Sequence, residues 1–311
     1  MMLRREKRDI SEFGSLFEPQ EAVQPILARP VRDALTDWLT EIWAEDELRE
    51  VGLTARSRAI FDGPPGVGKT TLAHHLCARL GLTMVAVRPD RMIDKWLGGT
   101  GKNIGDLFDA AAEQDPPIAL FFDEFDAIAV KRRAATQGAE QERNAFVNTL
   151  LQRLEQHRGF VIAATNFGSH IDQAIWRRFD IHITLALPGQ DERERILARY
   201  LSPYVLPPAA LKSLAEAFET AAPALMRQWA EGIKRYVVIG PKAGWDMSKR
   251  AAVSAVLTTV SPHPDLGKPR LWTRGTADAA VSTMPWPLSK DATQPSPAEN
   301  MDRVVPFSGR A

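Results

Sequence analysis

The chain has 311 residues, of which 44% are hydrophobic and 25% charged, so it can bury one or two globular cores. Basic and acidic residues both number 39, so nothing in the overall charge indicates a nucleic-acid or membrane partner. This balance does not exclude a local basic patch on the surface. The single cysteine, Cys77, excludes an internal disulfide, and no apolar run of about 18 residues occurs, so we expect a cytoplasmic protein without membrane spans.

Residues 1–56 are expected to form a linker with one amphipathic helix. Between Pro30 and Val51, large apolar side chains recur at helical spacing, and we expect this face to pack on the core of the protein. These side chains are Val31, Leu35, Trp38, Leu39, Ile42 and Trp43.

Residues 57–187 alternate short, β-rich apolar runs with longer helical stretches. Continuous apolar runs separated by helices are typical of a parallel sheet that is covered on both faces. We therefore predict a three-layer α/β/α domain with a five-stranded parallel sheet, whose ligand lies beyond the carboxyl ends of the strands. The five predicted strands are Arg58–Phe61, Thr83–Val87, Ile118–Phe122, Phe160–Ala164 and Ile181–Leu185.

Residues 188–260 carry a helical pattern and are expected to form a small second domain, in which Pro208 and Pro223 suit the first turn of a helix. The predicted helices cover Asp191–Leu201, Pro208–Phe218, Pro223–Tyr236 and Met247–Val260. Residues 261–311 are rich in proline, which favours an extended or partly disordered tail. Trp272 and Trp286 in this tail could dock on a partner, but docking on the chain itself is the preferred interpretation.

The strongest motif follows the first predicted strand and reads Gly63-Pro64-Pro65-Gly66-Val67-Gly68-Lys69-Thr70. This is the phosphate-binding pattern GxxxxGK[ST] in its expected context between a strand and a helix. Glycines let backbone N–H groups point at phosphate oxygens, and the helix N-terminus adds positive potential. We predict that Lys69 reaches the β- and γ-phosphates of ATP, that Thr70 coordinates Mg²⁺, and that the adjacent Thr71 also belongs to the nucleotide site.

Two carboxylates, Asp123 and Glu124, follow the third predicted strand, Ile118–Phe122. The alternative is that both side chains are simply solvated at the end of the strand. Their spacing along the sequence from the phosphate-binding motif favours a catalytic role instead. We expect Asp123 to hold the Mg²⁺ shell, and Glu124 to orient and deprotonate the attacking water.

These motifs, with three further stretches in the same order, resemble the AAA ATPases of the AAA+ superfamily. The further stretches are Lys95–Ile104, Phe122–Ile128 and Ala163–Asn166. The similarity covers about Arg58 to Leu201, and the FtsH-type proteases, proteasomal ATPases and microtubule-severing enzymes of the katanin and spastin kind look nearest. It implies an Mg²⁺-dependent ATPase that works as a homo-oligomeric ring, in most cases a hexamer, with a helical lid.

The resemblance also assigns roles to polar residues outside the two motifs. Asn166 matches the sensor that places the attacking water, although an Asn at a strand end can also simply form a turn. Arg177 and Arg178 fall where the family has arginine fingers that act on the neighbouring subunit's nucleotide, and a guanidinium suits the charge of a transferring phosphoryl group. Many members have Pro-Gly between these arginines, whereas here they are adjacent, as in the severing-type subgroup. Arg227 could be a second sensor or an ordinary surface arginine.

Trp96, Leu97 and Gly98 match the loop with which these proteins grip an extended polypeptide in the central pore. The alternative is that Trp96 packs against its own domain, since burial is what a large apolar side chain normally gains. The preferred function is therefore ATP-driven threading or remodelling of a protein substrate. The alternative is an ATP-dependent switch or loader acting on DNA, and a nucleotide-binding scaffold without catalysis is disfavoured because Lys69 and Glu124 are both present.

Overall fold

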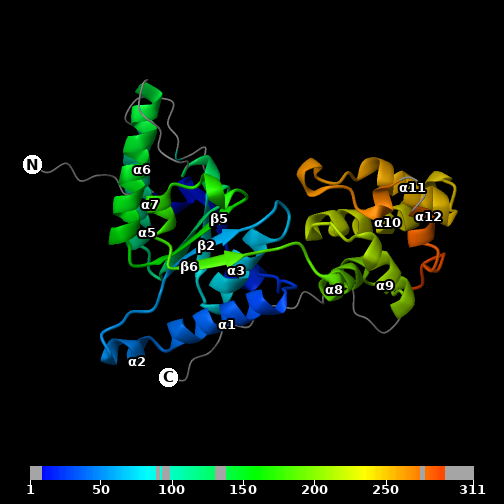
Figure 1. Ribbon diagram of the computed structural model, residues 1–311, viewed down its shortest axis with the longest axis horizontal. Helices are drawn as coiled ribbons and strands as arrows, with labels where there is room; N and C mark the ends of the chain where they lie inside the picture. Colours follow the sequence, from blue (N-terminus) through cyan, green and yellow to red (C-terminus); the bar gives the residue numbers. More distant parts are fainter. Residues whose placement is uncertain (1–8, 89–91, 93–98, 130–137, 274–276, 291–311) are drawn as a thin grey trace, which may run out of the picture.

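The computed structural model describes residues 9–88, 92, 99–129, 138–273 and 277–290. Its centre is a six-stranded sheet with the order β1-β3-β4-β5-β2-β6 (Figure 1). Strands β2 to β6 run parallel to one another, and β1 pairs antiparallel with β3. The strands are β1 Gly14–Phe17, β2 Arg58–Asp62, β3 Thr83–Val87, β4 Ile118–Phe122, β5 Phe160–Thr165 and β6 Ile181–Thr184.

The prediction of five parallel strands is confirmed for β2 to β6, but the sheet has a sixth strand that the sequence did not indicate. Strand β1 is only four residues long and half-exposed, so it lacks the apolar run that marks the buried strands. Gly14 opens it opposite Val87. A Cβ atom at Gly14 would lie 2.3 Å from the carbonyl oxygen of Ala86, so the two strands can approach this closely only at a glycine.

Helices cover both faces of the sheet (Figure 1). One face packs on α1 (Arg29–Trp43) and α3 (Lys69–Arg79), and the other on α5 (Gly99–Ala112), α6 (Gly138–Gln156) and α7 (Gln173–Trp176). In β4, Ala119 and Phe121 belong to the first core, whereas Leu120 and Phe122 belong to the second. Both faces of this strand are therefore buried, which explains its uninterrupted apolar sequence.

The amphipathic segment before the sheet folds as α1 followed by the short helix α2 (Glu45–Glu50). Leu35, Trp38 and Leu39 of α1 are buried against the sheet, as the pattern predicted. The indole of Trp38 also donates a 2.8 Å hydrogen bond to the carbonyl oxygen of Arg56, which ties α1 to the chain just before β2. Trp43 remains 39% exposed at the end of the helix.

A separate group of helices follows β6 and forms its own core (Figure 1). Its helices are α8 (Gln190–Leu201), α9 (Pro208–Ala217), α10 (Pro223–Ala243), α11 (Lys249–Thr259) and α12 (Ala277–Ala280). Trp229 and Phe218 lie fully buried in it with edge-to-face rings. Short 3₁₀ helices elsewhere cover Ile10–Glu12, Pro19–Glu21, Phe125–Ala127, Gly168–His170, Pro264–Leu266 and Arg270–Trp272.

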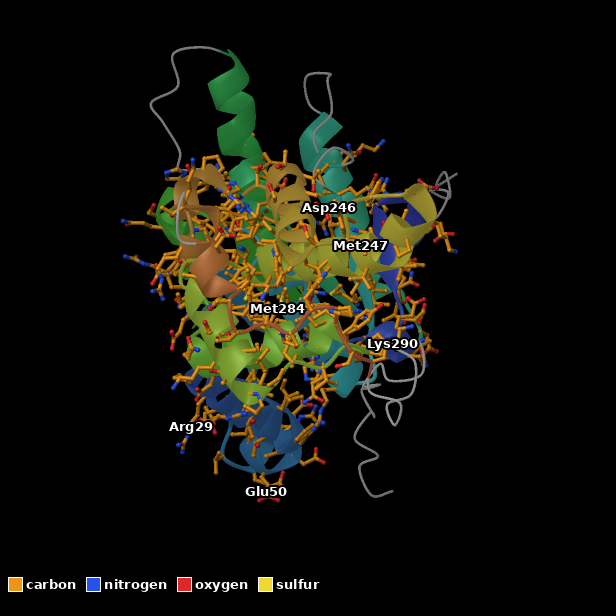
Figure 2. All side chains as sticks on the ribbon, turned by 90° about the vertical axis from the view of Figure 1, so that its right-hand side faces the viewer. Arg29, Glu50, Asp246, Met247, Met284 and Lys290 are labelled. Atoms are coloured by element: carbon orange, nitrogen blue, oxygen red, sulfur yellow. The ribbon has the colours of Figure 1, made fainter. Side chains whose placement is uncertain are left out.

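Residues 261–273 and 277–290 dock on these helices, as the self-docking interpretation expected. The indoles of Trp272 and Trp286 donate to the backbone carbonyls of Val260 (2.7 Å) and Met247 (2.6 Å). The Lys249 ammonium donates to three carbonyls of the segment, those of Val281, Ser282 and Met284, at 3.0, 3.1 and 2.9 Å. Figure 2 looks onto this side of the molecule, and Met247 lies above Met284 in that view. Within the described residues, none of the helices is long and apolar enough to cross a membrane.

Candidate functional site

The loop that joins β2 to α3 requires glycine at two positions. At Gly63, an added Cβ atom would lie 2.2 Å from the carbonyl oxygen of Leu185, so no larger residue fits beside the end of β6. Gly68 has a φ of 98°, which L-residues rarely adopt, and an added Cβ atom would meet no protein atom within 4 Å. The backbone at Gly68 is therefore open on its Cβ side, next to the first N–H groups of α3, which can bind an anion.

Lys69, the first residue of α3, is only 7% exposed. Its ammonium donates to the carbonyl oxygens of Gly63 (2.6 Å) and Pro64 (3.0 Å) and to Oδ1 of Asn166 (2.7 Å). Burial lowers the pKa of Lys69, and the carboxylates of Asp123, Asp62 and Asp126 act in the opposite direction. The loop, α3 and the end of β5 therefore meet at one ammonium group.

Thr70 and Asp123 lie side by side, with the threonine hydroxyl donating to Oδ2 of Asp123 at 2.8 Å. Hydroxyl and carboxylate oxygens are the hard ligands that Mg²⁺ prefers, so this pair fits a magnesium ion. The exposed Glu124 follows with a φ of 48°, and its backbone N–H donates to Oδ1 of Asp123 at 2.9 Å. This left-handed conformation is strained for a non-glycine residue and turns the chain sharply after β4.

Asp126 fixes the end of β5 where Asn166 lies. Its Oδ1 atom accepts hydrogen bonds from the Thr165 hydroxyl (2.7 Å) and from the Asn166 backbone N–H (3.1 Å). Asp62 accepts similarly from the N–H of Gly168 at 3.2 Å. Our sequence reasoning gave no role to Asp126 or Asp62, although both follow the apolar strands that carry the site.

The three predicted arginines lie away from this cluster. Arg178 forms an ion pair with Glu155 of α6, and Arg227 lies 3.6 Å from Glu231 of its own helix with its side chain 55% exposed. Arg177 ends α7 with an exposed side chain. In the described part of the chain, none of the three makes a polar contact with Lys69, Thr70 or Asp123. Trp96, Leu97 and Gly98 lie outside the described residues.

A small cavity of about 70 Å³ adjoins the glycine loop and was not foreseen from the sequence. Backbone contact also links this region to the helices that follow β6, because the N–H of Ala224 donates to the carbonyl oxygen of Gly66 at 3.2 Å. The cavity combines four stretches that are far apart in the sequence, which no local motif could have revealed. They are Val23–Leu27, the loop and helix residues Val67, Gly68 and Thr71, the α8 residues Ile196, Arg199 and Tyr200, and Pro223 of α10.

Comparisons with known proteins agree with this geometry. Residues 59–187 match the sequence model of the "ATPase family associated with various cellular activities (AAA)". The uncharacterized AAA family ATPase y4kL of Sinorhizobium fredii is 42% identical over 174 residues, which is 55% of this chain and 51% of that protein. Proteasome-activating nucleotidase 2 of Halobacterium salinarum is 34% identical over 178 residues, 54% of this chain and 42% of that protein. The ATP-dependent zinc metalloprotease FtsH of Hahella chejuensis is 35% identical over 158 residues, 49% of this chain and 25% of that protein. The chain thus spans about half the length of the first relative, and less of the others.

Proposed function

Because residues 59–187 belong to the AAA family of ATPases, we propose that the chain binds and hydrolyses ATP and couples the reaction to work on a protein substrate. The observation that supports this best is the convergence of Lys69, Thr70, Asp123 and Asn166. They come from three separate segments and meet within hydrogen-bond distance at the carboxyl edge of the sheet.

In the proposed site, the phosphates lie in the loop from Gly63 to Gly68 and on the first turn of α3. Lys69 exchanges its contacts with loop carbonyls for the β- and γ-phosphate oxygens, while Thr70 and Asp123 hold Mg²⁺, which neutralises charge on those oxygens.

Hydrolysis needs a water molecule in line with the bond between the γ-phosphorus and the leaving oxygen of ADP. We assign Glu124 to accept the proton of this water as its oxygen bonds to phosphorus, and Asn166 to help orient it. The bond to ADP breaks in the same step, and the products are ADP and inorganic phosphate. The Asp126 hydrogen bonds act as positioning contacts, because they hold the backbone of Asn166.

We propose a homo-oligomeric ring, with six subunits as the expected number, in which Arg177 or Arg178 completes the site of the neighbouring subunit. The exposed Arg177 suits this role better, because Arg178 is already paired with Glu155 in its own chain. Arg227 at the start of α10 is a weaker candidate for contact with the γ-phosphate.

The protein substrate is proposed from the resemblance of Trp96, Leu97 and Gly98 to a pore loop, and from relatives whose names refer to the proteasome and to a protease. The balanced charge of the chain gives no support to DNA as the substrate. The DNA loader remains an outcome of the test below.

The test uses Glu124→Gln, which should bind ATP without hydrolysing it and so retain its substrate, with Lys69→Ala as the control that should not bind ATP. Steady-state phosphate release should vanish in both variants. After nuclease treatment in the presence of ATP, a specific protein should co-purify with Glu124→Gln only. If nuclease is omitted and nuclease-sensitive DNA co-purifies without any protein, the result would instead support the loader. Wild-type rates of phosphate release in Glu124→Gln would contradict the proposed site.

A further inference from the structure

A larger cavity, of about 550 Å³, lies where α1, α3 and α8 meet. It shares the segment Gln24–Leu27 and Arg199 with the small cavity beside the glycine loop, but no residue of that loop is among its described lining residues. Its volume falls in the range of about 300 to 1,000 Å³ that is usual for small-molecule sites. The proposed nucleotide site does not use it.

The lining of this cavity is strongly basic, although the chain as a whole carries equal numbers of basic and acidic residues. Four of its fourteen described lining residues are arginines (Arg32, Arg79, Arg195 and Arg199), and none of the fourteen is an aspartate or glutamate. Leucines and an isoleucine supply apolar wall between these groups, namely Ile26, Leu35, Leu39 and Leu76.

Arg199 donates a 2.6 Å hydrogen bond to the carbonyl oxygen of Gln24. The other three arginines keep donors without close partners within the described residues. Nε of Arg79 is buried without a partner in the described residues, and its guanidinium lies 5.8 Å from the centre of the Trp43 ring. Within the described residues, Arg195 makes two long contacts of 3.5 Å, with the carbonyl oxygen of Leu27 and with Glu192. Arg32 takes part in no ion pair within the described part of the chain. Of these donors, Nε of Arg79 is the buried one; a buried donor without an acceptor costs free energy, and an anion in the cavity would satisfy it. Arg32 and Arg195 are exposed at the rim and add positive charge.

His75 adds a polar atom to the same wall. Its Nδ1 is buried without a partner among the described residues. Burial, together with the charges of Arg79 and His74, lowers the pKa of His75 to about 4. The ring is therefore neutral near pH 7, and the positive charge of the cavity comes from the arginines.

We propose that this cavity binds a small phosphate-bearing molecule with an apolar part. Guanidinium groups match phosphate oxygens in charge and in their fork of donors, and the apolar wall suits a ring or short chain attached to the phosphate. The site lies beside the proposed nucleotide site, because its cavity shares Gln24–Leu27 and Arg199 with the small cavity at the glycine loop. Helix α3 also joins the two: it begins at Lys69, and Arg79 in its last turn lines the larger cavity.

Isothermal titration with phenyl phosphate tests the proposal. Lys69→Ala is the background, because it disables the glycine loop as a competing phosphate site. We expect one site per chain, with at least about tenfold tighter binding of phenyl phosphate than of inorganic phosphate, as burial of a ring predicts. Adding Arg32→Gln or Arg79→Gln should weaken binding about tenfold or more. Adding Arg49→Gln, an exposed arginine of α2 that pairs with Glu45 and Asp46, should not.

Binding of phenyl phosphate weaker than about 10 mM in the Lys69→Ala background would overturn the proposal. Equal affinity with and without Arg32→Gln would also do so, and because Arg32 is exposed, that change leaves the fold intact. Equal affinity for phenyl and inorganic phosphate would refute the apolar part. Failure of the proposed nucleotide site is recognised separately, because wild type and Lys69→Ala would then give the same titration curve.

Discussion

Arg177→Ala is expected to abolish ATP hydrolysis without harming the fold. Arg177 is exposed and makes no ion pair in the described part of the chain, so its loss should change the free energy of unfolding by no more than about 0.5 kcal/mol. An arginine finger contributes about 10³ to 10⁵ in rate. Arg178→Ala should also cost less than about 1 kcal/mol, because its pair with Glu155 is 39% and 50% exposed, but it should retain more activity.

Action across a subunit interface can be separated from action within one chain by mixing two inactive variants. Arg177→Ala keeps its own Glu124, and Glu124→Gln keeps its Arg177. If the two are co-expressed, about a quarter of the interfaces in a randomly mixed ring combine an intact Glu124 with a neighbour's intact Arg177.

Steady-state phosphate release should therefore recover to a substantial fraction of the wild-type rate in the mixed rings, far above either variant by itself. The matched control is co-expression of Arg177→Ala with the double variant Arg177→Ala, Glu124→Gln, which has no complete interface. Recovery no greater than in this control would refute the assignment of Arg177 to a neighbour's site.

Three further predictions concern stability. Gly68→Ala and Gly81→Ala each place a Cβ atom at positive φ with no atom nearby, so each should lower the free energy of unfolding in chemical denaturation by about 1 kcal/mol. Only Gly68→Ala should lose thermal stabilisation by Mg·ATP, because only Gly68 lies in the proposed nucleotide site. Glu124→Gly relieves a φ of 48° and should raise the free energy of unfolding by about 1 kcal/mol while hydrolysis is lost; a clear fall in stability would contradict the strain. Burial lowers the pKa of His75 from its ordinary value of 6.5 to about 4 in the folded chain. Between these two pH values the unfolded chain binds more protons than the folded chain, so the free energy of unfolding should fall as the pH drops from about 6.5 to 4. After allowance for the partial exposure of the ring, the loss is about 2 kcal/mol or less, and urea titrations of His75→Gln should show a flatter profile.

The parallel strands were predictable because burial on both faces leaves an uninterrupted apolar sequence, as in β4. Strand β1 was not, since its four residues pair with β3 through backbone groups and a close approach at Gly14 that no local pattern records. The frequent prolines predicted an extended or partly disordered tail over residues 261–311, but within residues 261–273 and 277–290 the structure has two 3₁₀ helices and the short α12. Proline frequency also carried no information about docking. That depends on where the indoles of Trp272 and Trp286 find carbonyl acceptors.

Within the candidate site, the residues that motifs identified are those whose chemistry depends on spacing along the chain, such as Lys69 and Thr70. The Asp126 contacts with Thr165 and Asn166 join neighbouring strands, so they became visible only with the sheet order. The cavity beside Thr71 and Tyr200 needs four segments that are far apart in the sequence. The roles of Arg177, Arg178 and Arg227 stay predictions, because each depends on contacts beyond a single chain or on bound nucleotide.

The docked C-terminal segment decides where the chain can be shortened. Leu271, Val281, Met284 and Leu288 are buried in the core formed by α8 to α11, so the segment completes that core. A protein cut before residue 270 would expose the apolar faces these side chains cover and leave the Lys249 ammonium without its three carbonyl acceptors. Such a fragment would carry the features by which cells recognise damaged proteins for refolding or degradation. A premature stop codon in this stretch would therefore lower the amount of protein in the cell even though every residue of the proposed nucleotide site is still encoded.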